Sequence, residues 1–565
     1  MEEMFLSKYH RKEPIRDFDV CQTLYSLVMN INKNNMEDYY AAYLGQRLTF
    51  SQLKSDADKL AAALTQDGIK DGDIVGVCLL TVPEVAPVLL GINKIGASSY
   101  WMDASAKPTD MLAHINMHGV KTLIVFEALL PIVAGIIEYT QLERVIVVKA
   151  WFPLGKPPEE ITRVLDNRFF IYKDYIESAV DTDCEPAQFV MNKPTIIVQS
   201  SGSTGQSKSI VHTDYNFNAA IKMVAHLDLP LYQKKKSLVC APPWVIYGLV
   251  DSIYTGLVLG SETIYTTKPV EDMIYQHLGQ FDYVYGVPVY YRYLYNKMLE
   301  LKKQSNEESV KEFDRIKTCL DSVSVFISGG DKLSEEEAIQ WQLMFDTPVV
   351  NGYGNNEVVG AAVVSPMYAN RPGSIGVPGY GIIAKTFDVD TEAMLEDGEV
   401  GELCLSSTSL FKGYLDVPDE TVKIKRVHND REWVHTGDLA YINEDGFVYL
   451  KGRTRRLIID KLGYKIAPDN IENLIQHFDF VRECVVVGTL AGENDTVPVA
   501  FVEFTKGNKN NPSLLKEIEN ACKSSLKEYE IPKLIKEINK IPHKENGGKQ
   551  DFLALEKLAQ DLYKS

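Results

Sequence analysis

The stretch from Ile196 to Thr213 reads I-I-V-Q-S-S-G-S-T-G-Q-S-K-S-I-V-H-T. The β-branched run at its start predicts a buried strand. In the loop that follows, two glycines permit positive φ and a close approach of the backbone to a ligand. Hydroxyls, main-chain N–H groups and the Lys208 ammonium would suit phosphate oxygens. A mobile Ser/Gly linker has a similar composition, so the interpretation depends on further segments.

Length and charge narrow the class of protein. A chain of 565 residues is too long for one core, and two to four folding units are expected. A content of 45% hydrophobic and 24% charged residues is typical of a soluble globular protein. The net charge of −18 disfavours nucleic acid or an anionic membrane as a partner, because either would require a basic surface.

Cysteine usage and the start of the chain predict a cytoplasmic protein. The eight cysteines are scattered singly, which favours reduced thiols over a disulfide framework or a zinc site. No signal peptide is visible at the start. The most apolar region, residues 74–102, is interrupted by Glu84, Asn93 and Lys94, so no membrane span is expected.

Strand-like and helical runs alternate along most of the chain. A helical pattern through Leu64 precedes a strand, and a second helix is expected to end near Gly96. Such alternation predicts parallel β-α-β units. The first set of predicted strands covers residues 74–80, 123–126 and 145–148; the second set begins at Ile196 and continues through residues 237–240, 261–265, 283–287, 323–328 and 348–351.

The pattern changes beyond Arg371. Short strands separated by Gly and Pro turns predict a small β-barrel-like subdomain. The last hundred or so residues predict a separate mixed α/β domain, with strands at 484–487 and 499–504 and a helix at 514–526. The predicted fold class is therefore α/β.

Further strings occur in order along the chain, the first three of them at the ends of predicted strands. They are P-P-W-V-I-Y-G at 242–248, S-G-G-D-K-L at 328–333, N-G-Y-G-N-N-E at 351–357, T-G-D at 436–438 and G-G-K-Q-D at 547–551. Together with the Ser/Gly loop, they resemble the signatures of the adenylate-forming (ANL) superfamily, which includes acyl-CoA synthetases, aryl-CoA ligases, luciferases and peptide-synthetase adenylation domains. The chain has no carrier-protein serine motif, so it resembles a stand-alone acyl- or aryl-CoA synthetase.

The resemblance implies an ATP site. Lys208, Glu357 and Lys549 would be catalytic: Ser203, Thr204 and Lys208 would contact the pyrophosphate side, Glu357 would hold Mg²⁺, and Lys549 would contact the bridging oxygens. Asp438 would accept from the ribose hydroxyls. The implied nucleotide-binding residues are Ser201, Gly202, Ser203, Thr204, Gly205, Lys208, Gly329, Gly330, Asp331, Asn351, Gly352, Tyr353, Gly354, Asn356, Asp438, Arg453 and Lys549. Asn356 departs from the family, where threonine is usual.

The resemblance also implies an acid pocket and a hinge. The pocket would be lined by Trp244, Val245, Tyr247, Gly352 and Val358. No acidic residue precedes Asp251 in the pocket segment, so an α-amino acid, whose ammonium would lack a counter-charge, is disfavoured. Arg455 takes the hinge position between two domains. The N-terminal domain, residues 1–454, would contain two β-α-β subdomains and the small barrel. The C-terminal domain, residues 455–565, would be mobile. Lys461, Gly463 and Tyr464 would face the thiol, in a loop one residue longer than usual, and the loop of Lys549 is likewise one residue longer.

The implied reaction has two steps. A carboxylic acid attacks the α-phosphorus of ATP and releases pyrophosphate, and a thiol, expected to be coenzyme A, then displaces AMP. A carrier-protein thiol or an amine is an alternative acceptor, and the sequence leaves both the choice and the oligomeric state open. An inactive nucleotide-binding scaffold is the alternative from another class. The interpretation as a P-loop ATPase is excluded, because the pattern G-x-x-x-x-G-K-[ST] does not fit the spacing of the Ser/Gly loop.

Overall fold

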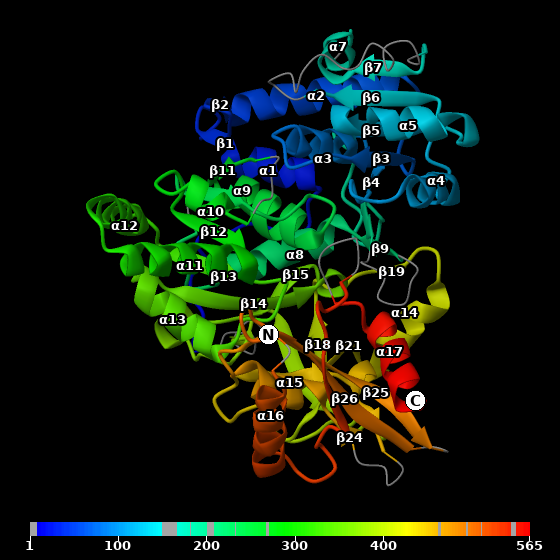
Figure 1. Cartoon of the computed structure of the whole chain (residues 1–565). Coiled ribbons are helices and arrows are strands. Elements are labelled where there is room, and N and C mark those ends of the chain that lie inside the picture. Colours follow the sequence, from blue (N-terminus) through cyan, green and yellow to red (C-terminus); the bar gives the residue numbers. More distant parts are fainter. Residues whose placement is uncertain are drawn as a thin grey trace. The chain divides into compact units, whose positions relative to one another are not determined.

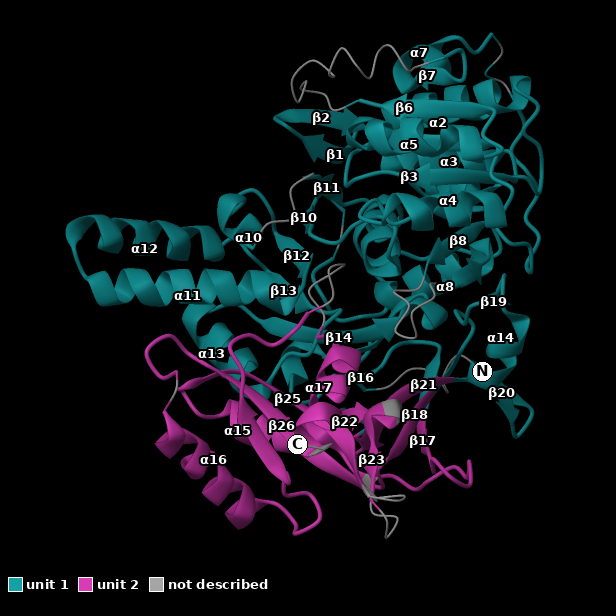
Figure 2. Cartoon of the chain, turned by 45° about the vertical axis from the view of Figure 1, so that its right-hand side comes forward, with its two compact units in different colours: residues 1–384, 405–434, 446–448 teal, residues 385–404, 435–445, 449–565 magenta. Residues whose placement is uncertain are grey.

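The structure is a computed structural model. It describes residues 8–149, 166–180, 182, 184–199, 208–231, 233–266, 271–460, 465–492, 495–509, 511–543 and 550–564. The chain divides into two compact units (Figure 2): unit 1 comprises residues 1–384, 405–434 and 446–448, and unit 2 comprises residues 385–404, 435–445 and 449–565. The boundary predicted between residues 454 and 455 stays a prediction, and residues 449–454 lie in unit 2.

The first sheet of unit 1 has eight strands in the order β19-β9-β8-β4-β3-β5-β6-β7. From β8 to β7 every pairing is parallel, as expected for β-α-β units. The three predicted strands of the first set are confirmed. The bounds are β3 Ile74–Cys78, β4 Ser98–Trp101, β5 Thr122–Phe126, β6 Arg144–Val148, β7 Phe169–Ile171, β8 Ile196–Gln199, β9 Ser209–His212 and β19 Gly413–Tyr414.

The prediction that a second set begins at Ile196 is wrong. β8 pairs with β4 in the first sheet, where Ser99 lies opposite Ile196. β9 then returns antiparallel beside β8, with Ile197 opposite Val211. The order of strands along the chain is a local property, whereas the sheet that a strand joins depends on pairing with distant residues.

The second sheet of unit 1 has nine strands in the order β16-β15-β14-β13-β12-β10-β11-β1-β2. Its parallel part runs from β14 to β1 and contains the remaining predicted strands. The bounds are β1 Tyr39–Tyr43, β2 Gln46–Thr49, β10 Lys236–Val239, β11 Glu262–Ile264, β12 Tyr283–Gly286, β13 Val325–Ser328, β14 Val349–Asn355, β15 Gly360–Val364 and β16 Val377–Pro378.

Helices pack on these sheets, and the local signals for them are clear. α2 (Phe50–Gln66) starts at Thr49, whose side chain accepts from the Gln52 N–H in a capping box. All ten residues of α3 (Val85–Lys94) are buried. Among the described residues of unit 1, the other α-helices and the π-helix η4 are α1 Leu24–Asn32, α4 Pro108–Met117, α5 Leu130–Ile136, α7 Tyr172–Glu177, α8 Asp214–Ala225, η4 Tyr247–Tyr254, α9 Thr255–Leu259, α10 Met273–Gln276, α11 Pro288–Gln304, α12 Glu307–Leu320, α13 Glu335–Phe345 and α14 Pro418–Ile424.

The region of short strands predicted beyond Arg371 forms a five-stranded sheet in the order β17-β18-β21-β20, with β22 paired to β21. The bounds are β17 Ile382–Phe387, β18 Gly401–Ser407, β20 Lys425–His428, β21 Arg431–Ile442 and β22 Val448–Arg453. No helix among the described residues is long and apolar enough to span a membrane.

The C-terminal part of unit 2 is a mixed α/β fold, as predicted. A three-stranded sheet, β25-β26-β27, carries helices that bury apolar residues against it (Figure 1). The predicted strands and helix are confirmed as β25, β26 and α16. The bounds are β23 Ile458–Ile459, β24 Lys465–Ile466, α15 Pro468–Gln476, β25 Val481–Gly492, β26 Asp495–Phe504, α16 Pro512–Ser525, β27 Leu534–Glu537 and α17 Phe552–Lys564.

Candidate active site

The end of β13 and the middle of β14 bring two predicted nucleotide segments together. The strands are parallel, with Ser328 opposite Asn351, so Gly329 and Gly352 continue from neighbouring positions. A Cβ on Gly329 would lie 3.1 Å from the Gly352 carbonyl oxygen, so glycine keeps these two segments close. Gly330 has a φ of +76°, which glycine adopts without strain. Asp331 is exposed, and its Oδ1 accepts from the Lys332 N–H at 2.8 Å.

A tight turn positions Glu357 directly after β14. A Cβ on Gly354 would lie 1.7 Å from the Gly360 carbonyl oxygen, so only glycine fits there. The short 3₁₀ helix η5 (Asn356–Val358) is capped by Asn355, whose Oδ1 accepts from the Val358 N–H at 3.0 Å. Val359 follows with a φ of +59°, a strained conformation for a β-branched residue. Backbone strain of this kind gathers at functional sites.

Glu357 and Lys208 both contact Tyr414. The Tyr414 hydroxyl donates to Glu357 Oε1 at 2.7 Å, and the Lys208 ammonium lies 4.8 Å from the centre of the Tyr414 ring. Lys208 Nζ also lies 3.1 Å from Glu420 Oε2. Two predicted catalytic residues from distant segments therefore share one neighbouring side chain within unit 1.

Other predicted nucleotide residues lie around this turn. Asn356 Nδ2 donates to the Gln199 carbonyl oxygen at 3.5 Å, which joins the turn to the end of β8. Asn351 and Tyr353 are half-buried on β14, and Tyr353 pairs with Val363 of β15. Their proposed contacts with adenine stay predictions.

Part of the predicted site lies outside the described residues. This applies to Ser201, Gly202, Ser203, Thr204, Gly205, Lys461, Gly463, Tyr464 and Lys549. The backbone of Arg455 is described and belongs to the 3₁₀ helix η7 (Thr454–Arg456) inside unit 2. Its role as a hinge stays a prediction.

The predicted acid-pocket residues contact different parts of unit 1. The Tyr247 hydroxyl donates to the Gly286 carbonyl oxygen at 3.0 Å, and a Cβ on Gly329 would lie 3.2 Å from Tyr247 Cζ. Tyr247 therefore lies against Gly329, the glycine that also lies close to Gly352. Trp244 and Val245 are half-buried, and Trp244 packs on the core of the first sheet. Val358 is buried, with 1% of its surface exposed.

In unit 2, Asp438 and Arg453 form an ion pair, whereas their proposed contacts with the ribose stay predictions. Arg453 Nε lies 2.7 Å from Asp438 Oδ1, and the Asp438 side chain is 8% exposed. The Thr454 hydroxyl donates to the Gly437 carbonyl oxygen at 3.1 Å. Gly437 has a φ of +73°, which places the Asp438 turn in a conformation suited to glycine.

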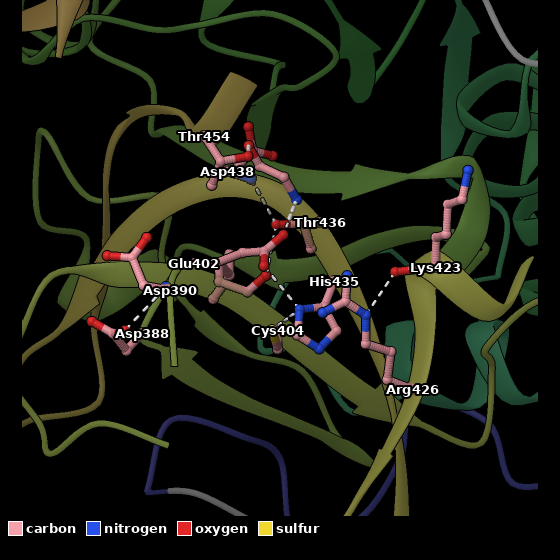
Figure 3. A network of polar contacts seen from close by, with 12 residues as sticks. Asp388, Asp390, Glu402, Cys404, Lys423, Arg426, His435, Thr436, Asp438 and Thr454 are labelled. Carbon is pink, nitrogen blue, oxygen red and sulfur yellow. Dashed lines mark hydrogen bonds and ion pairs between the residues drawn. The ribbon is translucent and has the colours of Figure 1, made fainter. Parts of the chain in front are cut away.

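Glu402 and His435 support that turn (Figure 3). Glu402 Oε1 accepts from the Gly437 N–H at 2.9 Å, and Glu402 Oε2 lies 2.8 Å from His435 Nδ1. The Thr436 hydroxyl donates to the Leu403 carbonyl oxygen at 2.7 Å and accepts from the Asp438 N–H at 3.1 Å. These contacts tie the Asp438 turn to β18.

Two groups of side chains have ligand atoms suited to a cation. Glu357 is half-buried, and its Oε2 has no hydrogen-bond partner among the described residues. A carboxylate oxygen of this kind fits Mg²⁺. Glu402, Cys404 and His435 offer ligand atoms within 4.8 Å of one another, but hydrogen bonds from Gly437 and His435 already engage both Glu402 oxygens.

The sequence-based prediction missed Tyr414, Glu402 and His435. Tyr414 occurs in a G-Y pair, Glu402 in a G-E-L-C string and His435 just before T-G-D. The strings were visible, but nothing in their spacing shows which distant side chain each one contacts. The proximity of His435 to T-G-D was the one available signal.

Comparison with known proteins identifies the family. The AMP-binding enzyme model matches residues 30–415, and the AMP-binding enzyme C-terminal domain model matches residues 470–548. A long-chain-fatty-acid–CoA ligase of Escherichia coli O157:H7 is 24% identical over 533 residues, covering 90% of this chain and 89% of the relative. The enzyme of the same name from Bacillus subtilis (strain 168) is 24% identical over 541 residues, covering 92% of each chain.

Solved structures share the fold. ATP-bound MatB from Rhodopseudomonas palustris has a TM-score of 0.81 at 20% identity, covering 95% of this chain and 99% of that one. The anthranilate CoA ligase AuaEII in complex with anthranoyl-AMP has a TM-score of 0.79 at 20% identity, covering 96% and 99%. The solved structures confirm the predicted fold class, and the family models together with the relatives confirm the predicted superfamily and enzyme type. Because the first family model spans more than half of the chain and contains both Lys208 and Glu357, the chain belongs to the AMP-binding enzyme family.

Proposed function

We propose that the chain joins a carboxylic acid to coenzyme A in two steps, through an acyl-adenylate. The observation that carries this proposal is the convergence of Lys208 and Glu357 on Tyr414, which sets a cation beside a carboxylate at the carboxyl ends of the strands. Both groups are of the kind that handle a nucleotide triphosphate and its metal ion. The relatives named as CoA ligases support coenzyme A as the acceptor.

A free carboxylate is a poor electrophile, because oxide is a very poor leaving group. In the first step a carboxylate oxygen bonds to the α-phosphorus of ATP, and the bond from that phosphorus to the β-phosphate bridging oxygen breaks to release pyrophosphate. In the second step a thiolate attacks the acyl carbon and AMP leaves. The protein must hold two anions in line and stabilise the charge on the phosphates.

Each residue has one assigned task in this proposal. Lys208 contacts the pyrophosphate side together with Ser203 and Thr204, and Glu357 holds Mg²⁺, which would neutralise phosphate charge. Lys549 contacts the bridging oxygens in the first step. Asp438, oriented by the Glu402 and Arg453 contacts, accepts from the ribose hydroxyls.

The acid is proposed to be aromatic or medium-to-long aliphatic, without an α-ammonium group. Trp244, Val245 and Tyr247 present apolar surface on the pocket segment, and Val358 is buried beside Glu357. Asp251, the first acidic residue of that segment, is 2% exposed and already accepts from the Ala361 N–H at 3.3 Å. An α-ammonium in this pocket would lack a counter-charge.

A panel of carboxylic acids with ATP and Mg²⁺ tests the proposal, read as pyrophosphate release with and without coenzyme A. We expect release to require an acid, and thioester to form when coenzyme A is added. Lys208→Ala is expected to raise the ATP requirement more than it changes the order of preferred acids. Lys302→Ala, at an exposed lysine in the last turn of α11, is the matched control.

Each alternative has its own result in the same panel. Release without any acid would indicate an ATPase, and no release with any acid would indicate a scaffold. Adenylate formation without thioester would point to a carrier protein or an amine as the acceptor. Selective turnover of an ordinary L-amino acid would contradict the proposed substrate class.

A further inference from the structure

Tyr414 is buried between the two residues on which the proposed function depends. Its hydroxyl donates to Glu357 Oε1 at 2.7 Å, and its ring faces the Lys208 ammonium at 4.8 Å from the ring centre. Only 5% of its surface is exposed. Its position therefore fixes the distance between a carboxylate and an ammonium that come from different segments of unit 1.

The backbone around Tyr414 holds it firmly. β19 pairs antiparallel with β9, and Tyr414 lies opposite Ile210, two residues after Lys208. The Tyr414 N–H donates to the Thr421 hydroxyl at 2.8 Å, which joins β19 to α14. The ring packs edge-on against Phe411 at a centroid distance of 5.1 Å, and the Phe411 N–H donates to the Glu357 carbonyl oxygen at 2.8 Å. Both the ring and the hydroxyl thus have a defined place.

The protonation of Tyr414 suits a donor role. The ordinary pKa of a tyrosine hydroxyl is about 10. The phenol therefore keeps its proton at neutral pH and donates it in a hydrogen bond to the carboxylate. This contact occupies Oε1 and restricts the rotation of the Glu357 side chain. The electron-rich face of the ring attracts the Lys208 ammonium.

We propose that Tyr414 is a positioning residue for metal and phosphate binding. It orients the Glu357 carboxylate so that Oε2 faces the metal, and it holds Lys208 beside the same site. The inference rests on the proposed function, because it assigns Glu357 to Mg²⁺. A purely structural tyrosine would matter for folding and would leave metal affinity unchanged.

Tyr414→Phe separates these two roles. Phenylalanine keeps the ring that packs on Phe411 and faces Lys208, and it removes only the hydroxyl that donates to Glu357. Tyr275→Phe is the matched control, because the Tyr275 hydroxyl donates to Glu312 Oε1 at the same 2.7 Å, on α10 and α12 away from β19 (Figures 1 and 2). Both variants thus remove one hydrogen bond from a phenol to a carboxylate.

The experiment measures Mn²⁺ binding to the full chain in complex with α,β-methylene-ATP, by electron paramagnetic resonance, and follows thermal unfolding in parallel. We expect Tyr414→Phe to weaken Mn²⁺ binding roughly tenfold, as loss of one hydrogen bond to a charged group would. In turnover assays the KM for Mg²⁺–ATP should rise while the KM for the acid stays unchanged. Tyr275→Phe should leave Mn²⁺ binding and both KM values as in the wild type.

A double-variant comparison completes the test. Once Glu357→Gln has removed the carboxylate, Tyr414→Phe should cause little further loss of Mn²⁺ affinity. Wild-type Mn²⁺ affinity in Tyr414→Phe, or a loss that adds fully to that of Glu357→Gln, would overturn the inference. A wild type without acid-dependent pyrophosphate release would overturn the proposed function instead, and the Mn²⁺ titration would still decide on Tyr414.

Discussion

Asp251 shows how one buried side chain can tie the stability of this protein to pH. It lies in the π-helix η4, with 2% of its surface exposed, and its Oδ1 accepts from the Ala361 N–H at 3.3 Å. Oδ2 has no hydrogen-bond partner among the described residues. Burial raises the pKa of Asp251 to about 7, because the hydrogen bond from Ala361 offsets only part of the desolvation.

The direction of this pH dependence follows from the linkage between proton binding and folding. The folded-state pKa lies above the value in the unfolded chain, so the folded state holds the proton more tightly. The stabilisation that the protonated Asp251 carboxyl gives to the folded state is fully present below about pH 4 and is lost as pH rises toward 7. Asp251→Asn does not titrate and keeps an oxygen that can accept from Ala361. We therefore expect this variant to be more stable than the wild type at pH 8, by at most about 4 kcal/mol, with the difference vanishing near pH 4.

Thermal unfolding of both proteins between pH 4 and pH 8 measures this difference. Comparing the two curves at each pH removes the contribution of every other titrating group. Parallel curves across the whole range would show that Asp251 stays ionised in the folded protein, and the raised pKa would then be wrong.

At the scale of elements, α3 shows how a helix with polar residues can be buried completely. Glu84, Asn93 and Lys94 interrupt the apolar pattern of the sequence, yet all ten residues of α3 are buried. Lys94 Nζ lies 2.9 Å from Asp58 Oδ1 on α2, and Asn93 Nδ2 donates to Asp214 Oδ1 on α8 at 2.7 Å. Each polar group on the helix thus meets a partner on a neighbouring helix, as burial requires.

Lys94→Met tests the α2–α3 ion pair. The variant leaves the Asp58 carboxylate buried without one of its cations, so we expect a loss of about 3 kcal/mol in the free energy of unfolding. The double variant Asp58→Leu, Lys94→Met should lose less than the sum of the single variants, because it removes both charges. Urea unfolding of the three proteins measures these values.

Lys59→Met is the control for this prediction. Lys59 also lies on α2 and pairs with Glu177 at 2.7 Å, but that pair is more exposed. An exposed pair contributes about 1 kcal/mol or less. Equal losses for Lys59→Met and Lys94→Met would show that burial adds nothing to the Lys94 pair.

At the scale of the whole molecule, the residues assigned to the reaction are divided between two units. Lys208 and Glu357 belong to unit 1, whereas Asp438, Arg453 and Lys549 belong to unit 2. Adenylation requires charge stabilisation at the pyrophosphate that leaves, and this group is no longer present during thiol transfer. The two half-reactions should therefore respond differently to changes in unit 2.

Lys549→Ala is expected to slow adenylation by about 10²–10³, because it removes a charged donor from a developing anionic centre. Thioester formation from a pre-made acyl-adenylate should survive, since no phosphate transfer remains. Arg455→Pro is expected to do the reverse, because fixing φ in the predicted hinge would impede rotation. Both half-reactions are assayed separately, with Lys557→Ala on the exposed side of α17 as the control. Equal losses in both steps for Lys549→Ala would mean a structural lysine.

The sequence by itself determined the identity and order of many core strands, and it proposed where the chemistry lies. β3, β5, β6 and the strands of the second set lie where their apolar runs predicted them. Lys208, Glu357 and Asp438 were proposed as site residues because each belongs to a short motif. These signals are local: strand and helix periodicity, caps and turn residues depend only on neighbours along the chain.

Only the tertiary structure decided which segments meet. β8 joins the first sheet beside β4 and not the second one, and Tyr414 lies between Glu357 and Lys208. The spacing of residues along the chain reveals neither contact, because long-range pairing depends on loop closure and on side-chain packing among distant residues. The burial of Lys94 and Asp251 was hidden for the same reason: each polar group is buried in a place that other segments create.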